Sequence, residues 1–448
     1  MSRFDLAVIG AGSGGVRTAR LAASQGWRVA VIEERFAGGT CVNVGCVPKK
    51  LMSYAAGFQH QFELAADFGW SLNGHAQLSW ETLKTHRDRE IARLQSVYRK
   101  LLDTSGVSWL DGHARLESAD TIRIGHQSIH ADRILIATGS RPFLPDIPGK
   151  EHLSISDDLF SMSQQPKQVI VWGGGYIASE FASILNGLGS QVTIVHRGPH
   201  VLNRFDAESA RFLQAALERQ GIRARMNTQI TSVSAQGRLL EATLNDGQRI
   251  TADAIFCATG RIPNTENLGL AATGIETDTA GNIAVNAQHE TSVKSIYALG
   301  DVTGGAQLTP VALREAMNLI DHWFHGGKNA LPLDLIPNAI FTHPCYASVG
   351  MSEEAARQHA DKLTVYRSEF RPMDHTLGQK PDRVLIKLLV DGSTDAILGA
   401  HMVGEGAGEI IQGIAMAMAC GATKASLDAT LGIHPTVAEE WVTLRTPS

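Results

Sequence analysis

Two of the five cysteines in the sequence, Cys41 and Cys46, are separated by only four residues. In an ideal α-helix, Cα atoms five positions apart lie about 8 to 9 Å from each other, whereas a disulfide requires about 4.4 to 6.8 Å. The pair can therefore be bridged only where the backbone departs from an ideal helix, and Gly45 and Pro48 permit such a departure. A bridge closed in this way is strained and reducible, so the spacing predicts a working redox pair.

Two other uses of cysteine compete with this interpretation. A structural zinc site brings a second pair of Cys or His at short spacing. The other cysteines, Cys257, Cys345 and Cys420, are scattered along the chain, so we predict no metal site. An inert buried thiol is the usual alternative for a single cysteine.

The elements that must position the pair begin with a glycine-rich turn. Residues 4–9 are an apolar run that predicts a strand, and residues 28–32 predict a second strand that ends at Glu33. The glycines of the pattern G-x-G-x-x-G are Gly10, Gly12 and Gly15. Such glycines allow a tight turn and a close approach of pyrophosphate to a helix N-terminus, while an acid such as Glu33 bonds ribose hydroxyls. The register of these elements predicts a dinucleotide-binding unit.

A second copy of this unit follows later in the chain. Strand-like residues 169–172 precede Gly173-Gly174-Gly175-Tyr176-Ile177-Ala178, and residues 191–195 predict the next strand. Both copies close on Ala-Thr-Gly, at 137–139 and 258–260. The glycine turns are 163 positions apart but these endings only 121, so the first copy is about 42 residues longer. The cysteine pair lies in that longer stretch, so the redox chemistry belongs to the first unit.

The residue that ends the second strand predicts which nucleotide each unit binds. Glu33 suits a ribose without a 2′-phosphate, as in FAD or NAD. In the second unit, His196 and Arg197 stand at this place, with His200 and Arg204 nearby. Cations in place of an acid favour a 2′-phosphate, hence NADPH. A solvated basic turn is the alternative.

Composition limits the class of protein. At 448 residues the chain is long enough for two to four domains, and its hydrophobic fraction of 44% is that of an ordinary globular protein. A net charge of −5 gives no reason to expect nucleic acid or an anionic membrane as a partner. With no apolar run of membrane-spanning length and no signal peptide, we expect a cytoplasmic protein, in which a cysteine pair is better interpreted as catalytic than as structural.

The remaining chain predicts two further regions. Residues 51–103 are mainly helical, with an insertion around Asn73-Gly74. From residue 336 the pattern changes to an α+β texture. Its expected strands are 339–342, 363–370, 384–391 and 396–403, and its expected helices are 406–420 and 437–445.

The run Gly38–Lys50, GGTCVNVGCVPKK, resembles the redox site of the flavin-dependent pyridine nucleotide-disulfide oxidoreductases, and the resemblance covers the whole chain. It implies that Cys41 attacks the substrate disulfide and that Cys46 contacts the flavin. It also implies that Lys49 pairs with Glu180 beside the flavin ring and that Tyr176 gates the nicotinamide pocket.

The ending of the chain, residues 432–443, is similar to that of family members that reduce glutathione disulfide. The resemblance implies that His434 is an acid/base delivered into the partner subunit's active site and oriented by Glu439. A homodimer with shared active sites follows from this role. Taken alone, a histidine before a proline is more often a surface or capping residue.

The resemblance also implies an α/β fold with two Rossmann-like dinucleotide-binding domains and a C-terminal α+β dimerisation domain. The expected boundaries are 1–145 with 275–335 for FAD, 146–274 for NADPH and 336–448 for dimerisation. Asp301, after a strand-like run, would bond the ribityl chain of the flavin, although a simple turn or helix cap has the same pattern. The residues expected to bind the two cofactors are Gly10, Gly12, Ser13, Gly14, Gly15, Glu33, Gly39, Thr40, Thr138, Gly139, Asp301, Gly173, Gly175, Tyr176, Ile177, His196, Arg197, Arg204, Gly260 and Arg261.

By resemblance the reaction is the NADPH-driven reduction of glutathione disulfide to glutathione. Family contacts to the substrate correspond to Ser13, Arg20 and Tyr98, whereas Met317 stands where some members have an arginine. A modified glutathione disulfide or dihydrolipoamide therefore stays open as the substrate. The family's second NADPH arginine corresponds to Asn203, beside Arg204. A flavin-binding redox sensor without turnover is the alternative from another class.

Overall fold

The computed structural model describes residues 2–71, 76–328, 332–333 and 335–448, and the chain forms two compact units. Unit 1 comprises Met1–Lys49, Lys84–Phe143 and Gly260–Leu333, and unit 2 comprises Lys50–Leu83, Leu144–Thr259 and Asp334–Ser448. The expected insertion around Asn73-Gly74 lies outside the described residues. The division into three domains predicted from the sequence is finer than these two units and stays a prediction. Among the described residues, no helix combines the length and apolar character that a membrane span needs.

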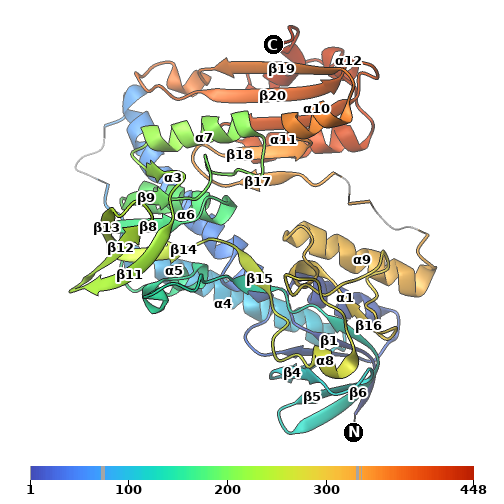
Figure 1. The fold of residues 1–448 in the computed structure, drawn as a ribbon. Coiled ribbons are helices and arrows are strands. Elements are labelled where there is room, and N and C mark those ends of the chain that lie inside the picture. The colour runs from blue at the N-terminus through green and yellow to red at the C-terminus, as the bar shows by residue number, and fades with distance from the viewer. Residues whose placement is uncertain (1, 72–75, 329–331, 334) are drawn as a thin grey trace. The chain divides into compact units, whose positions relative to one another are not determined.

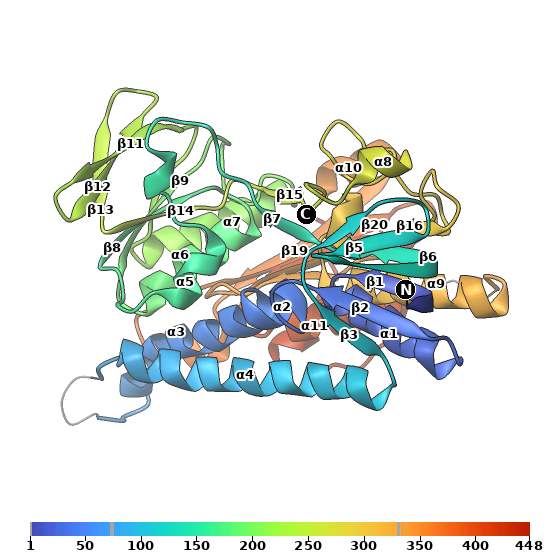
Figure 2. The same cartoon turned by 90° about the horizontal axis from the view of Figure 1, so that it is seen from below.

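Unit 1 is built around a sheet of order β3-β2-β1-β6-β5-β4, with β16 paired to β6 (Figure 2). The second half of β1, Leu6–Ile9, is wholly apolar and buried because both of its faces are covered. Leu6 and Val8 pack in one core cluster and Ala7 and Ile9 in another. Helices α1 and α9 lie side by side in Figure 1 and contribute to the first of these clusters. The elements are β1 (Arg3–Ile9), α1 (Ser13–Ser24), β2 (Val29–Glu33), α2 (Gly39–Asn43), β3 (Ser108–Asp111), β4 (Ala114–Leu116), β5 (Thr121–Ile124), β6 (Gln127–Ile136), β7 (Ser140–Pro142), β15 (Arg261–Pro263), α8 (Leu270–Thr273), β16 (Ile296–Ala298), the 3-10 turn η2 (Gly300–Thr303) and α9 (Thr309–His325).

Helices α3 (Cys46–Asp67) and α4 (Trp80–Thr104) each begin in one unit and end in the other. They confirm the mainly helical character expected for residues 51–103. The first turn of α3 contains Cys46 and Pro48, where a proline is tolerated because the N–H groups of a first helical turn lack intrahelical partners.

The first half of unit 2 repeats the nucleotide-binding pattern. Its parallel sheet has the order β10-β9-β8-β14, and a three-stranded antiparallel sheet has the order β11-β12-β13. The expected strand 191–195 is observed with the same bounds. The elements are α5 (Ser156–Ser161), β8 (Gln168–Trp172), α6 (Tyr176–Gly187), β9 (Gln191–Val195), α7 (Ala207–Arg219), β10 (Arg223–Arg225), β11 (Ile230–Gln236), β12 (Leu239–Leu244), β13 (Arg249–Ala252) and β14 (Ala254–Cys257).

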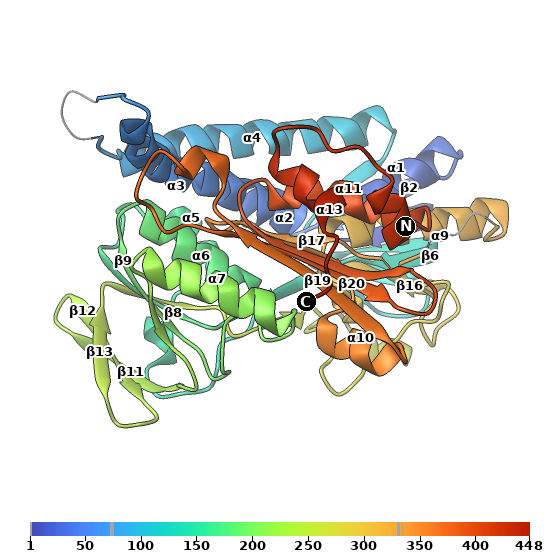
Figure 3. The ribbon, with the colours of Figure 1, turned by 90° about the horizontal axis from the view of Figure 1, so that it is seen from above.

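The second half of unit 2 is an antiparallel sheet of order β17-β18-β21-β20-β19, along which α11 lies (Figure 3). Ile386 and Leu388 pack in one core cluster with Ile411 of α11. Since successive side chains of a strand alternate between faces, Lys387 points to the opposite face. The elements are β17 (Asn338–Ile340), β18 (Tyr346–Gly350), α10 (Glu353–His359), β19 (Leu363–Phe370), β20 (Val384–Asp391), β21 (Ile397–Val403), α11 (Ala407–Ala419), α12 (Lys424–Asp428) and α13 (Glu440–Thr443).

Two expected elements of this region are corrected. The strand expected over 339–342 ends at Ile340, because the next backbone N–H, that of Phe341, donates to the Glu180 carboxylate and not to a neighbouring strand. The helix expected over 437–445 is a 3-10 turn, Val437–Glu439, followed by the single turn of α13. The sequence analysis also missed β18 and α10.

A buried ion-pair network lies on the Lys387 face of β20. The Lys387 ammonium is 1% exposed and lies 2.9 Å from Asp206, 2.7 Å from Glu353 and 2.9 Å from Glu208. Asp206 also caps α7 by accepting a hydrogen bond from the Ser209 backbone N–H. Removing the Lys387 ammonium would leave the buried Asp206 carboxylate uncompensated, so the network holds α7 to the sheet.

Candidate active site and nucleotide sites

The backbone between the two cysteines leaves the helical conformation, as the spacing required. Helix α2 ends at Asn43, Val44 adopts φ −137° and ψ 31°, and α3 starts at Cys46. A Cβ on Gly45 would lie 2.7 Å from the Thr40 carbonyl oxygen and 3.2 Å from the Cα of Cys41. Only glycine therefore allows this close return of the chain, which brings Cys46 back toward Cys41.

The two thiols interact with each other and with the start of α9. A hydrogen bond with the Cys46 side chain raises the pKa of the half-buried Cys41 thiol, and burial and the charge of Cys46 add to the increase. A hydrogen bond with the Thr309 side chain acts in the opposite direction. Thr309 is the first residue of α9, so the positive end of a 17-residue helix lies beside the pair. Such a position stabilises a thiolate.

Tyr98, one of the residues expected to bind substrate, lies near Cys41. Burial and the charge of Cys41 raise the pKa of the Tyr98 phenol, and the charge of Arg17 lowers it. Arg20 donates from Nε to the Ser105 hydroxyl at 3.4 Å. The sequence analysis missed Arg17, which lies three positions before Arg20 and therefore on the same face of α1. Its position three residues before Arg20 in a predicted helix is the sequence feature from which it could have been predicted.

The first glycine turn has the shape of a pyrophosphate site. Gly10 has φ +107°, and a Cβ there would lie 2.4 Å from the Ala137 carbonyl oxygen, so only glycine fits. A Cβ on Gly12 would meet no atom within 4 Å, which leaves space above the turn. Gly39 approaches this turn so closely that its Cβ would lie 2.6 Å from the Cα of Gly12. The cysteine segment thus begins directly against the glycine turn.

Polar side chains complete the first nucleotide site. Glu33 accepts a hydrogen bond from the Ala11 backbone N–H at 2.7 Å, which fixes the carboxylate beside the turn. Asp301 accepts from the Ser140 hydroxyl at 2.7 Å, and Arg261 donates to the same hydroxyl at 2.8 Å. An open glycine turn, a helix N-terminus and fixed carboxylates for ribose and ribityl hydroxyls fit the donor and acceptor groups of FAD.

Glu315 on α9 is a buried acid that the sequence analysis did not identify. It accepts a hydrogen bond from the Gly300 backbone N–H at 2.7 Å. Burial raises the pKa of its carboxyl, the Gly300 hydrogen bond lowers it, and the charge of Asp301 raises it further. Glu315 therefore fixes the backbone immediately before Asp301.

The second glycine turn repeats the geometry of the first. Gly173 has φ +147°, and its Cβ would lie 2.2 Å from the Ala258 carbonyl oxygen, while a Cβ on Gly175 would meet nothing within 4 Å. Tyr176 follows as the first residue of α6 and is 37% exposed. The Leu202 backbone N–H donates to the Gly174 carbonyl at 2.6 Å, which holds the loop 197–204 against the turn.

The two expected cations at the end of β9 differ in their environment. His196 is buried, and a Cβ on Gly174 would lie 2.4 Å from its ring. Burial, and then the charges of Arg197 and His200, lower the pKa of His196, so its imidazole is neutral at pH 7. Arg197 and Arg204 are exposed. The positive charge of this loop therefore resides on the two arginines.

His434 and Glu439 are brought together as expected. The His434 Nδ1 lies 3.1 Å from each carboxylate oxygen of Glu439, although the histidine side chain is 80% exposed. Such a contact places the Nδ1 proton toward Glu439 and leaves Nε2 as the basic nitrogen. The neighbouring Leu431 and Ile433 are 93% and 76% exposed. Exposed apolar side chains around a fixed imidazole are typical of a surface that a partner covers.

The expected pairing of Lys49 with Glu180 stays a prediction, because Lys49 belongs to unit 1 and Glu180 to unit 2. Within unit 2, Glu180 is buried and accepts a hydrogen bond from the Phe341 backbone N–H at 2.9 Å.

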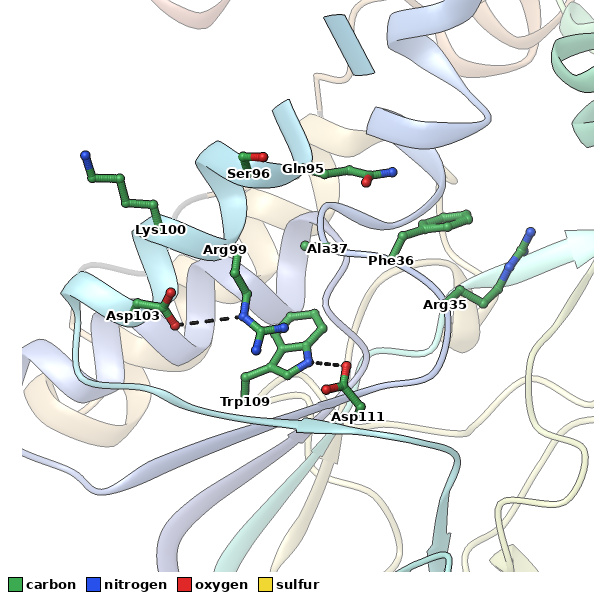
Figure 4. A pocket seen from close by; sticks show the side chains of 10 residues that line it. All are labelled: Arg35, Phe36, Ala37, Gln95, Ser96, Arg99, Lys100, Asp103, Trp109 and Asp111. Atoms are coloured by element: carbon green, nitrogen blue, oxygen red, sulfur yellow. Dashed lines mark hydrogen bonds and ion pairs between the residues drawn. The ribbon is translucent and has the colours of Figure 1, made fainter. Parts of the chain in front are cut away.

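Unit 1 also contains a cavity of about 480 Å³ that the sequence analysis did not predict (Figure 4). One of its lining residues, Arg35, lies two positions after Glu33 in the sequence. The Arg99 guanidinium lies over the Trp109 ring at 4.1 Å, and the Trp109 indole N–H donates to Asp111 at 2.6 Å. The lining residues are Arg35, Phe36, Ala37, Gln95, Ser96, Arg99, Lys100, Asp103, Trp109 and Asp111.

Comparison with known proteins agrees with this geometry. The chain matches the family described as pyridine nucleotide-disulphide oxidoreductase over residues 4–316, and the dimerisation domain of that family over residues 336–445. It is 46% identical to the glutathione reductase of Burkholderia cepacia over 99% of this chain and 98% of the relative. It is 41% identical to the chloroplastic/mitochondrial glutathione reductase of Pisum sativum, over 99% of this chain and 83% of the relative.

Among solved structures, the chain resembles a Cu(II) complex of the HOCl-induced flavoprotein disulfide reductase RclA from Escherichia coli. The identity is 27%, the TM-score is 0.88, and 99% of each chain is covered. The chain belongs to the pyridine nucleotide-disulphide oxidoreductase family, and its cofactors are FAD and NADPH.

Proposed function

We propose that this chain is an NADPH-dependent glutathione-disulfide reductase that works as a homodimer in the cytoplasm. The observation that carries the proposal is the Cys41–Cys46 pair. Its chain returns on itself at Gly45, beside the FAD-binding turn and the start of α9. The names of the relatives with more than 40% identity support the substrate, and the matched dimerisation domain supports the dimer. The three domain boundaries predicted from the sequence are part of this proposal.

The cofactors have assigned places in the proposal. When bound, FAD supplies the two-electron link between NADPH and the Cys41–Cys46 disulfide. Glu33 and Asp301 would hold FAD in unit 1. In unit 2 the turn at Gly173 would hold NADPH, and Arg197 and Arg204 would bind its 2′-phosphate. Lys49, Glu180 and Tyr176 would act on the flavin and the nicotinamide.

The protein's own groups then carry the disulfide exchange. His434 of the second subunit takes the proton of the Cys41 thiol at Nε2. The Cys41 thiolate attacks one sulfur of glutathione disulfide, forms a mixed disulfide and releases the first glutathione thiolate, to which His434 gives this proton. Cys46 next attacks the Cys41 sulfur, which releases the second glutathione and closes the Cys41–Cys46 disulfide. The dithiol loses two electrons and the substrate gains them. Glu439 keeps the His434 proton on Nδ1, so that Nε2 exchanges the proton with substrate.

Substrate recognition is proposed to use the cations of α1. In this proposal Ser13, Arg20 and Tyr98 contact the substrate; Tyr98 lies near Cys41, and Arg17 adds a second guanidinium near Tyr98. A guanidinium binds carboxylates in a bidentate manner, which suits the carboxylates of glutathione. Met317 on α9 offers no such charge and is 44% exposed.

The test is a steady-state assay of the purified holoenzyme with a panel of disulfides. We expect NADPH oxidation with glutathione disulfide at a kcat/KM at least about a hundredfold above that with glutathione amide disulfide, because one carboxylate contact to arginine contributes about 1.5–3 kcal/mol and the substrate carries several. Preference for the amide, or turnover with dihydrolipoamide and NAD instead, would contradict the proposed substrate. If NADPH reduced the flavin but no disulfide in the panel were turned over, the protein would instead be a redox sensor.

A further inference from the structure

Two histidines and an aspartate that are far apart in the sequence meet in unit 2. His60 lies on α3, His375 ends the 3-10 turn η3 (Met373–His375), and Asp382 lies just before β20. One ring nitrogen of each histidine and one carboxylate oxygen lie within 4.8 Å of one another. In the part of the chain that the structure describes, no other group of three His, Cys, Asp or Glu side chains has this spacing.

The central member of this cluster, His375, has an unsatisfied buried nitrogen. Its side chain is 9% exposed, and Nδ1 lies 3.3 Å from Oδ2 of Asp382. Despite this distance no hydrogen bond forms between the two atoms, and among the described residues this nitrogen has no hydrogen-bond partner. Burying a polar atom without a partner costs about 1–3 kcal/mol, so the arrangement requires an explanation.

The spacing is that of two ligands on one ion. Two ligand atoms bound tetrahedrally at about 2.0–2.1 Å from a zinc ion lie roughly 3.3 Å apart. The Nδ1 to Oδ2 distance has this value, and the third ligand atom needs a shift of about 1 to 1.5 Å to join them. His60 is half-buried on a helix surface, where a change of rotamer provides such a shift.

The charges around the cluster suit a divalent cation. The carboxylate of Asp374 lies 4.0 Å from Nε2 of His375, and Glu63 holds the Lys380 ammonium at 2.8 Å. With Asp382, the surroundings therefore contain three carboxylates and one ammonium.

The simpler alternative is an ion pair between a protonated His375 and Asp382, with the His60 ring packed beside them at 5.4 Å. That pair needs an Nδ1–H that donates to the carboxylate, and no such hydrogen bond forms. We propose that His60, His375 and Asp382 bind a divalent transition-metal ion of the zinc class through two imidazole nitrogens and one carboxylate oxygen. Imidazole and carboxylate ligands together suit Zn²⁺, Ni²⁺ and Cu²⁺. The ion cross-links α3 to the segment between β19 and β20.

The test is calorimetric titration of the metal-free, oxidised holoenzyme with Zn²⁺, followed by zinc-edge X-ray absorption. We expect one ion per chain with nitrogen and oxygen ligands, including two imidazoles, and a rise in Tm through preferential binding to the folded state. His60→Gln removes a half-buried ligand at a helix surface and should weaken Zn²⁺ binding at least about a hundredfold, since even a lost outer-shell partner costs about 10–100-fold. Asp382→Asn should do the same.

The matched control is His113→Gln, because His113 forms a single histidine–carboxylate contact with Glu34 at 2.8 Å without a second histidine. It should leave Zn²⁺ affinity unchanged. Sulfur ligands in the absorption spectrum would place the ion on the cysteines and overturn the proposal. Equal affinity of the wild type, His60→Gln and Asp382→Asn would overturn it as well. Flavin absorbance and the Tm without metal report whether each variant is folded.

Discussion

The two glycine turns share one backbone and diverge at the next strand end. Gly10 and Gly173 both have a positive φ, and at each a Cβ would collide with a carbonyl oxygen of a neighbouring strand end, 2.4 and 2.2 Å away. At the end of β2 stands Glu33, bonded to the turn; at the end of β9 stands the neutral, buried His196, packed on Gly174. We propose that the turn provides a place for pyrophosphate and that the strand end decides which nucleotide fits.

The segments that follow these strand ends also differ. After β2 the chain runs to Gly39, which packs on the first turn and starts the cysteine segment. After β9 the chain forms a loop over Gly174 and reaches Asp206, which forms an ion pair with Lys387. The first nucleotide-binding unit is thus followed by the cysteine segment, and the second by a structural ion pair between Asp206 and Lys387.

The largest expected effect comes from removing the chemistry that only the first unit has. Cys46→Ser should lower kcat for glutathione disulfide at least about a thousandfold, because the mixed disulfide on Cys41 then has no neighbouring thiol to resolve it. NADPH oxidation at saturating substrate measures this. Cys420→Ser, at an exposed thiol outside the site, is the control. Retention of a tenth of the activity would show that the pair is not the catalytic dithiol.

Alanine at either glycine should separate the two units. Gly10→Ala should reduce bound FAD to below about a tenth of the wild-type content, since the new methyl group meets the Ala137 backbone. Gly173→Ala should keep the yellow flavin and raise KM for NADPH at least about tenfold. Flavin absorbance per chain and steady-state kinetics distinguish the two results. Loss of flavin in both variants would mean that the units are not independent in binding.

The stability contributed by the ion pair between Asp206 and Lys387 should decrease at acidic pH. Burial alone would raise the pKa of Asp206, but the charge of His401, the Ser209 N–H and Lys387 outweigh it, so the pKa is lowered below its ordinary 3.8. The stability that ionised Asp206 contributes is therefore complete above about pH 4 and is lost as the pH falls through the lowered folded-state value.

Asp206→Asn should reduce the free energy of unfolding by about 3 kcal/mol at pH 7, because it removes a charge from a buried network. The difference from the wild type should stay constant between pH 7 and 5 and shrink below pH 4. Urea unfolding at each pH measures it. Asp246→Asn, at an exposed turn, is the control. A difference that grows with acidity would contradict the assigned charge state.

The smallest effect tests the strand-end rule itself. Arg197→Ala should lower kcat/KM for NADPH about tenfold and leave that for NADH almost unchanged, since one charge-assisted hydrogen bond to phosphate contributes about 1.5 kcal/mol. Arg238→Ala, on the exposed β11–β12 turn, should change neither value. An equal loss with both nucleotides would mean that Arg197 supports the loop and does not bind the 2′-phosphate.

The sequence predicted those features that depend on neighbours along the chain. Strands 363–370 and 384–391 were predicted with their observed bounds because long β-rich runs end in turn residues. The contact between His434 and Glu439 spans five residues and was also foreseen.

Features created by the fold could not be predicted in this way. The meeting of His60 with His375 joins segments 315 positions apart. The burial of His196 depends on a loop that closes over Gly174, and a strand-end histidine looks like a surface cation until that loop is placed. Arg17 acquires its relevance only when α4 brings Tyr98 to Cys41.

The close return of the chain at Gly45 has a consequence for the reduced enzyme. The backbone conformation, and not the disulfide, keeps residues 41 and 46 adjacent. The two sulfurs therefore stay close together after the disulfide is reduced. Each remains at a high effective concentration for the other, so ring closure outcompetes any thiol from solution. Because residue 45 is a glycine, Cys46 stays close enough to attack every mixed disulfide on Cys41 and to release the bound glutathione.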